Sequence, residues 1–278
     1  MKIIFCVKFF FNAGGAESQV LRLLPYFENE KIDYSVISQC NNNKNKFKNS
    51  KLGLCLYILK CLFAGLFADR NTIFYFIGAG VEKCIFYYFL KIKKIKYTVK
   101  IPTMLKGRGF DAFERALQKP FQGRIIKKFF QRANIIFTQD NLSKQVLSEK
   151  YGIDPLKVRI LLNGIEPHCL RKIKKVQNII FVGRILREKG VYEMLDFAKE
   201  SINSSKDWRI IMIGDGPELE NLKKMAGMQG IDNIKFYGYI EAVKKYYEEA
   251  DLFLFPSYRE GFPNVVLEAM SHGVPVLS

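Results

Sequence analysis

The stretch Asp251-Leu-Phe-Leu-Phe-Pro-Ser-Tyr-Arg-Glu-Gly-Phe-Pro-Asn-Val-Val-Leu-Glu268 combines an apolar run, a loop and the start of a helix. Leu252–Phe255 predicts a buried strand, and Pro263 suits a helix start, where its fixed φ and missing N–H do least harm. Two carboxylates, Glu260 in the loop and Glu268 about a turn into the helix, lie eight positions apart. A carboxylate accepts hydrogen bonds from two neighbouring hydroxyls, and a helix N-terminus attracts phosphate. The stretch therefore offers ligands for both halves of a nucleotide-sugar.

Apolar runs and helical patterns alternate along the rest of the chain, which predicts α/β architecture with parallel, doubly wound sheets. The pattern restarts after the polar stretch 163–175, a predicted linker that separates domains 1–166 and 167–278. The predicted strands are Ile3–Phe9, Tyr34–Ser38, Thr72–Phe76, Tyr97–Ile101, Ile135–Thr138, Val158–Leu161, Asn178–Val182, Arg209–Ile213, Ile234–Tyr237, Leu252–Phe255 and Val274–Leu277.

Length and composition exclude several protein classes. The 278 residues are 49% hydrophobic, enough for two packed domains. The six cysteines form no C-x-x-C pair, which predicts buried cytosolic thiols and argues against a disulfide framework or a zinc site. Lys8 interrupts the apolar start of the chain, which favours a first strand over a signal peptide. Leu52–Phe67 contains Lys60 and is short for a membrane span, so a buried or interfacial helix is expected.

The net charge of +17 is unevenly distributed. Residues 1–175 hold 32 Lys and Arg against 12 Asp and Glu, a net +20, and residues 176–278 hold 12 against 15, a net −3. The basic surface thus belongs to the first domain, and we interpret the excess as favouring an anionic membrane surface. Nucleic acid is the competing partner, but no recognition helix, zinc finger or RNP-like strand is present, and the carboxylate motif has no use there.

A basic amphipathic helix is predicted near residues 121–132. Its apolar side either packs on a sheet, with the basic side solvated, or lies on anionic lipid; packing on the sheet is favoured because doubly wound folds need covering helices. The apolar residues are Phe121, Ile125, Ile126, Phe129 and Phe130, and the cations are Arg124, Lys127, Lys128 and Arg132, with further lysines at Lys91, Lys93, Lys94 and Lys96.

Further loops follow predicted strands. Gly183 allows a tight exit from one strand, and Arg184 and Lys189 flank a loop that can bind a diphosphate or be an ordinary polar loop. Gly214 and Gly216 permit close backbone approach after the next strand, or form a plain turn. Because ligands of open α/β sheets bind at the carboxyl ends of the strands, the convergence of these loops with the Glu260 loop indicates a site.

The ordered motifs resemble the group 1 retaining glycosyltransferases (family four). The first domain resembles that family more thinly, at Gly14-Gly15 and Asn163-Gly164-Ile165, and Asn12–Glu17 is not a complete dinucleotide fingerprint. The second domain carries the resemblance almost continuously, through Gly183-Arg184, Glu188-Lys189-Gly190, Gly214-Asp-Gly-Pro217, Phe236-Tyr-Gly238, Pro256-Ser257, Glu260-Gly-Phe262 and Glu268-Ala-Met-Ser-His-Gly-Val-Pro-Val276.

The resemblance implies a GT-B architecture of two Rossmann-like domains, a nucleotide-diphospho-sugar donor, and no metal or other cofactor. Glu260 would contact the donor sugar and stabilise an oxocarbenium-like transition state, and Glu268 would bind the ribose. The remaining implied contacts are the diphosphate at Arg184, Lys189 and Gly15, the donor sugar at Phe262, Pro263, Asn264 and Val265, and the base near Gly214, Gly216, Pro217 and Tyr239.

The sequence departs from the family in two places. Val99–Gly109 lacks the histidine that many relatives carry near the sugar, so Lys100, Lys106 and Arg108 are candidates for an anionic acceptor, with solvated surface charge as the equal alternative. Relatives also continue beyond the position of Ser278, which implies an incomplete second domain. His272 follows the second carboxylate and is interpreted as structural.

The resemblance implies transfer of a hexose or N-acetylhexosamine from a UDP- or GDP-sugar to an acceptor hydroxyl, with retention of configuration. The expected acceptor is a glycan or lipid-linked glycan of surface polysaccharide, lipopolysaccharide or capsule, at the cytoplasmic face of the plasma membrane. The alternatives are an inactive fragment or a non-catalytic nucleotide-sugar-binding remnant; a sugar-nucleotide epimerase matches the motifs poorly.

Overall fold

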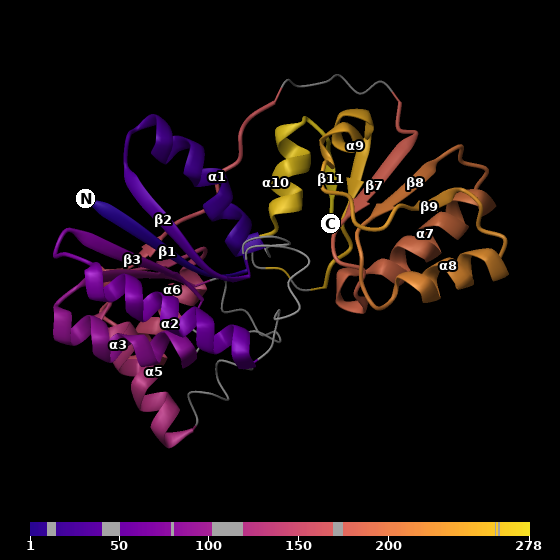
Figure 1. Ribbon diagram of the computed structural model, residues 1–278. Coiled ribbons are helices and arrows are strands. Elements are labelled where there is room, and N and C mark those ends of the chain that lie inside the picture. The colour runs from indigo at the N-terminus through magenta and orange to yellow at the C-terminus, as the bar shows by residue number, and fades with distance from the viewer. Residues whose placement is uncertain are drawn as a thin grey trace. The chain divides into compact units, whose positions relative to one another are not determined.

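A computed structural model describes residues 1–9, 15–40, 51–78, 81–101, 119–168, 175–258, 260 and 262–278. The chain forms two compact units, Met1–Asn163 and Gly164–Ser278. Each unit is built on its own parallel sheet, with helices on both faces (Figure 1).

Unit 1 holds six parallel strands in the order β2-β1-β3-β4-β5-β6. The strands are β1 Lys2–Phe9, β2 Asp33–Cys40, β3 Thr72–Ile77, β4 Lys96–Lys100, β5 Ile135–Thr138 and β6 Val158–Ile160. The helices are α1 Gly15–Asn29, α2 Lys51–Phe67, α3 Val81–Lys93, α5 Pro120–Arg132 and α6 Asn141–Tyr151, followed by the 3-10 turn η1 Pro155–Lys157.

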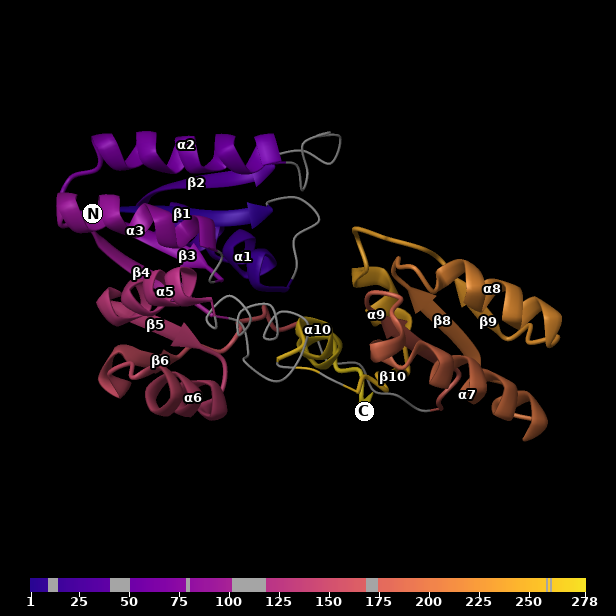
Figure 2. The same cartoon turned by 90° about the horizontal axis from the view of Figure 1, so that it is seen from below.

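The two faces of the unit 1 sheet carry different cores, because successive strand side chains point to opposite faces. Ile4 and Cys6 join the larger core, which also contains residues of α2, α3 and α5. Phe5 and Val7 of the same strand join a smaller core with Val20 of α1. Contacts place α3 beside both α2 and α5, as Figures 1 and 2 show.

Helix α5 packs its apolar stripe on the sheet. Ile125, Ile126, Phe129 and Phe130 are buried, which confirms the packing interpretation of this helix. Phe121 is the exception, because its side chain at the first turn is 73% exposed. Within the described residues, no helix combines the length and the apolar character needed to cross a bilayer.

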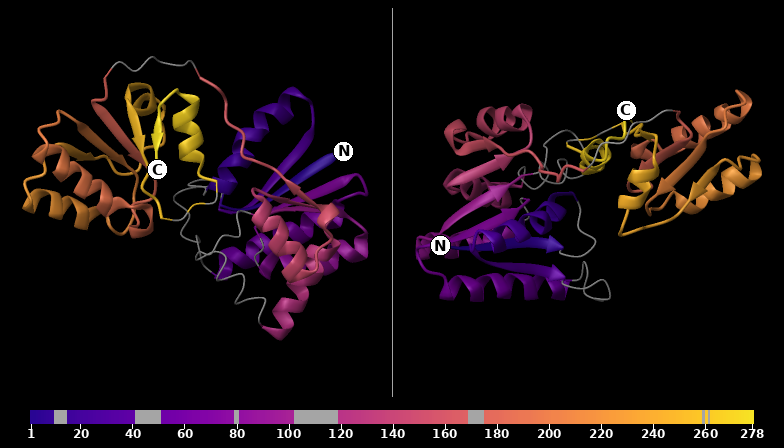
Figure 3. Two further views of the ribbon diagram at one scale, coloured as in Figure 1. Left: turned by 180° about the vertical axis from the view of Figure 1, so that it is seen from behind. Right: turned by 90° about the horizontal axis from the view of Figure 1, so that it is seen from above.

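Unit 2 holds five parallel strands in the order β11-β10-β7-β8-β9. The strands are β7 Asn178–Val182, β8 Arg209–Ile213, β9 Ile234–Phe236, β10 Leu252–Leu254 and β11 Val276–Leu277. The helices are α7 Val191–Asn203, α8 Leu219–Met228, α9 Lys244–Glu249 and α10 Asn264–Ser271, with the 3-10 turn η2 Arg187–Lys189 before α7. Helices α7 and α8 cover one face of this sheet and α9 and α10 the other (Figures 1 and 3), as right-handed crossovers require when the strand order reverses.

All eleven predicted strands are confirmed, three of them with the predicted bounds and the others with ends that differ by at most two residues. The final strand begins at Val276 instead of Val274, and Pro275 before it has no N–H to donate to a ladder. In each sheet the strand order reverses once, between β1 and β3 and between β7 and β10. Such reversals open a crevice at the carboxyl ends of the strands, where ligands of doubly wound sheets bind.

Candidate functional site

The strand order of unit 2 reverses between β7 and β10, and the candidate site is formed by the loops that leave these two strands. The β7 loop carries Arg184 and Lys189, and the β10 loop carries Glu260. The sheet thus brings together residues more than 70 positions apart at the reversal point between two neighbouring strands. Arg184 is exposed, whereas Lys189 and Glu260 are half-buried.

An ion pair and a hydroxyl hold the Glu260 carboxylate. Lys189 Nζ contacts Glu260 Oε1, with 15% and 24% of the two side chains exposed. The Ser257 hydroxyl donates a hydrogen bond to the same oxygen at 2.9 Å. Sequence reasoning included Ser257 in a motif but gave it no role; its place three residues before Glu260 in the same loop was the available signal. Two donors thus fix a carboxylate that the sequence assigned to the donor sugar.

Backbone contacts fix the two loops to each other. The Tyr258 N–H donates to the Glu188 carbonyl at 3.1 Å. Gly190 has φ +69°, and a Cβ there would lie 2.0 Å from the carbonyl oxygen of Pro256. Only glycine fits a left-handed position so close to another backbone. The spacing between the β7 and β10 loops therefore depends on Gly190.

The β8 loop packs against the β7 loop in the same way. Gly214 has φ +145°, and a Cβ there would lie 1.7 Å from the Gly183 carbonyl oxygen, while a Cβ on Gly216 would lie 2.3 Å from that of Ile185. These glycines are needed for packing between the loops, and their predicted place near the nucleotide base stays a prediction. Pro217 and Tyr239, predicted for the same region, are exposed.

Helix α10 presents its N-terminus beside the β10 loop. It begins at Asn264 after Pro263, with no side-chain cap and no acidic residue in its first turn. Such an end attracts anions through its N–H groups and its dipole. The predicted sugar contacts Phe262, Pro263, Asn264 and Val265 are all half-buried around this end.

Glu268, the second carboxylate, lies on the second turn of α10. Its Oε2 accepts a hydrogen bond from the Tyr247 hydroxyl at 3.2 Å. His272 follows at the end of the helix, where its Nδ1 lies 2.8 Å from the Glu268 carbonyl oxygen. Its ring stacks on Tyr247 and lies tilted against the ring of His168. His272 is buried among these groups, which agrees with its structural interpretation.

The acceptor-side candidates belong to unit 1. Lys100, at the end of β4, is only 4% exposed, so the alternative of solvated surface charge is wrong for this residue. Its Nζ donates to Asn163 Oδ1 at 3.0 Å, and burial lowers the pKa of the amine. Lys106 and Arg108 lie outside the described residues. Gly15, the predicted diphosphate contact of the first domain, is the first residue of α1.

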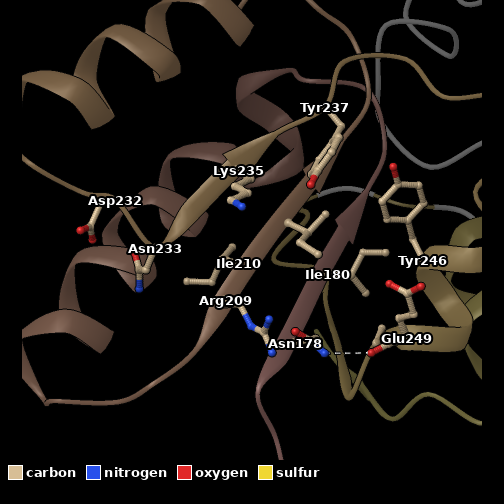
Figure 4. A pocket seen from close by; sticks show the side chains of 12 residues that line it. Asn178, Ile180, Arg209, Ile210, Asp232, Asn233, Lys235, Tyr237, Tyr246 and Glu249 are labelled. Atoms are coloured by element: carbon tan, nitrogen blue, oxygen red, sulfur yellow. Dashed lines mark hydrogen bonds between the residues drawn. The ribbon is translucent and has the colours of Figure 1, made fainter.

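A groove of about 270 Å³ in unit 2 lies away from the carboxyl edge (Figure 4). Most of its lining comes from the amino-terminal halves of β7 and β8 and from the turn before β9, including Asn178, Arg209 and Asn233. The Asn178 amide donates to the Glu249 carbonyl oxygen at 3.2 Å. The groove contains none of the predicted donor-site residues, so it is separate from the candidate site.

Comparison with known proteins decides the family. Residues 168–278 match the family model of the glycosyl transferases group 1. The chain carries a group 1 glycosyltransferase domain. An uncharacterized glycosyltransferase of Haemophilus influenzae is 31% identical over 149 residues, which is 51% of this chain and 41% of the relative. The chain thus spans less than half the length of this relative.

Solved structures show that this chain has the GT-B fold. The lipopolysaccharide outer core galactosyltransferase WaaB is 20% identical with a TM-score of 0.65, over 99% of this chain and 80% of that one. HepE of Anabaena, solved with UDP and glucose, is 17% identical with a TM-score of 0.68 and the same coverage. The predicted fold class is therefore confirmed, and the predicted family is confirmed for the matched residues 168–278.

Proposed function

We propose that this group 1 glycosyltransferase moves a hexose or N-acetylhexosamine from a UDP- or GDP-sugar to a hydroxyl of a glycan or lipid-linked glycan, in the synthesis of a surface polysaccharide, lipopolysaccharide or capsule. The anomeric configuration is retained, and no metal or other cofactor takes part. The reaction takes place at the cytoplasmic face of the plasma membrane. Solved neighbours hold UDP with glucose or with N-acetylglucosamine, which supports a nucleotide-sugar donor.

The observation that carries the proposal is the Glu260–Lys189 pair beside the N-terminus of α10 at the reversal point of the sheet. In the proposed reaction the helix end and the cations Arg184 and Lys189 bind the diphosphate. Breaking the bond between the anomeric carbon and the diphosphate oxygen leaves positive charge on the sugar and negative charge on the diphosphate. The Glu260 carboxylate stabilises the first charge, and the cations stabilise the second.

The sequence left open the alternative that the chain is a non-catalytic remnant, which binds the nucleotide-sugar but does not transfer the sugar. A direct test incubates the chain with UDP-glucose, UDP-N-acetylglucosamine or a GDP-hexose and measures the nucleotide released, with and without a glycan acceptor. Acceptor-dependent release of UDP or GDP supports transfer. Donor binding without release supports the remnant, and neither binding nor release contradicts both.

Replacing Arg184 with alanine should weaken donor binding by about tenfold to a hundredfold, because a charge-assisted hydrogen bond to phosphate contributes about 1.5–3 kcal/mol. Arg184 is exposed, so the fold should be unaffected. Arg209→Ala removes the same charge from an exposed position at the opposite end of the sheet and serves as the matched control. Equal UDP affinity in the Arg184→Ala variant and its parent would remove Arg184 from the diphosphate site.

A further inference from the structure

Helix α2 presents a continuous apolar stripe to solvent. Tyr57 and Cys61 face the core and are buried. The stripe, which we call the α2 stripe, follows helical spacing on the other side, with exposed fractions between 45% and 76% at Leu56, Leu59, Phe63, Leu66 and Phe67. Nothing in the described part of the chain covers it. Contiguous exposed apolar surface of this kind marks a site of interaction.

The α2 stripe continues onto helix α3. Gly65 lets the helices approach closely, because a Cβ there would lie 2.5 Å from a ring carbon of Phe89. At the ends of the helices, Lys93 Nζ donates to the Leu66 carbonyl oxygen at 3.3 Å. Ile92, next to Lys93 in the last turn of α3, is 80% exposed. Figures 1 and 2 show the two helices side by side.

A basic pocket lies on the other side of α3, where the chain turns into β4. It encloses about 220 Å³ between the ends of α3 and α5. Four of its lining residues are exposed cations, none is a carboxylate, and Tyr87, Leu90, Ile95, Tyr97 and Asn134 complete it; the cations are Lys91, Lys94, Lys96 and Arg132. A pocket whose charged lining residues are all cations suits a phosphate group.

We infer that the α2 stripe and the basic pocket form one docking surface for an anionic phospholipid bilayer. The stripe and Ile92 enter the acyl boundary, and the pocket takes a lipid phosphate. This deepens the membrane part of the proposed function and rests on it. The sequence weighed lipid contact at α5 against packing on the sheet and favoured packing, and the apolar stripe of α5 is buried in the core except for Phe121. The segment Leu52–Phe67, which includes most of α2, was expected to be a buried or interfacial helix.

Charge complementarity favours an anionic bilayer over the other partners considered. Residues 1–175 carry a net +20, which an anionic bilayer attracts. A second copy of the chain would place the same cations against each other, and a nucleic acid would leave the α2 stripe in water. The ends of α2 and α3 also lie at the amino edge of the sheet, because crossover helices run antiparallel to parallel strands. Docking there leaves the carboxyl edge, where ligands bind, open.

The test is sedimentation of the full chain with vesicles of phosphatidylcholine alone or with about a third phosphatidylglycerol. Each cation near the surface contributes about 1 kcal/mol, so Lys94→Glu with Lys96→Glu should lower partitioning onto anionic vesicles at least about tenfold. Leu59→Gln with Phe63→Gln should do the same by removing buried apolar area. Lys223→Glu with Lys224→Glu, and Met228→Gln, make matched changes at exposed positions of unit 2 and should change partitioning less than about twofold.

Three results would overturn the inference. The first is equal vesicle binding by the parent and both surface variants. The second is a concentration-dependent dimer that Leu59→Gln with Phe63→Gln abolishes, which would assign the stripe to a second copy. The third is retention of the chain by single-stranded RNA, lost with Lys94→Glu and Lys96→Glu, without vesicle binding. UDP titration of the same variants separates the two proposals. Surface variants that lose vesicle binding but keep the UDP affinity of the parent support the docking surface. A parent chain that binds vesicles but not UDP contradicts the donor site and leaves the docking surface supported.

Discussion

Replacing Glu260 with glutamine is expected to lower the turnover of sugar transfer by about 10²–10³, the size of effect seen when a fixed charge-stabilising group is removed from an active site. The substitution keeps the shape of the side chain and its ability to accept a hydrogen bond from Ser257, but it removes the negative charge. That charge is what the proposed mechanism requires at the donor sugar. Turnover is measured under saturating donor, so that the chemical step is compared.

Loss of the Glu260–Lys189 ion pair should cost little stability. Exposed ion pairs contribute about 1 kcal/mol or less. This pair is half-buried, but both side chains keep access to solvent, and glutamine can still accept a hydrogen bond from Lys189. Glu193→Gln is the matched control, because Tyr258 of the same loop donates to the Glu193 carboxylate on α7. That variant should retain turnover within about threefold of the parent, a difference below 1 kcal/mol. A Glu260→Gln variant that turns over like the parent would remove Glu260 from the mechanism.

Gly190→Ala should destabilise unit 2 by about 2–5 kcal/mol, from the cost of a left-handed alanine and of overpacking against the Pro256 carbonyl. The added Cβ meets backbone atoms, which cannot rotate away as a side chain does. Urea unfolding followed by tryptophan fluorescence reports on the correct unit, because Trp208 is the single tryptophan of the chain and stacks on Phe197 within unit 2.

Gly227→Ala is the control for this change. A Cβ at Gly227, within α8, meets no atom within 4 Å. Alanine is the better helix former, so this variant should be about 0.5–1 kcal/mol more stable than the parent. Equal unfolding midpoints for Gly190→Ala and the parent would mean that the β7 and β10 loops are not held at the observed spacing.

The fold followed from local signals. Short apolar runs such as Ile135–Thr138 and Asn178–Val182 have the predicted bounds because no polar residue interrupts them. In Asn178–Val182 the last four residues are all buried, as in a strand covered on both faces of a parallel sheet. The strand ends were less certain, because chain direction changes there without a change in hydropathy. The placement of Phe121 in the apolar stripe of α5 was wrong, because its helical spacing matches the stripe but its side chain in the first turn is exposed.

The site was predictable as a set of residues but not as a set of contacts. The motifs predicted that Arg184, Lys189 and Glu260 lie together at the carboxyl edge of the sheet. The pairing of Lys189 with Glu260 depends on how two loops from distant parts of the chain pack, which no local pattern contains. The hydrogen bond from the Ser257 hydroxyl to Glu260 lies within one loop, but the motif gave the hydroxyl no role. The burial of Lys100 was equally hidden, since a lysine at a strand end is usually solvated.

The central claim is that unit 2 binds a nucleoside diphosphate at the carboxyl edge of its sheet, and calorimetric titration of the 278-residue chain with UDP and GDP tests it most directly. We expect one-to-one binding of UDP or GDP, binding of the corresponding monophosphate weakened at least about tenfold by loss of a charged phosphate contact, and weaker diphosphate binding in the Glu268→Ala variant. Absence of binding for both diphosphates, or affinity that does not change between diphosphate and monophosphate, would contradict the account.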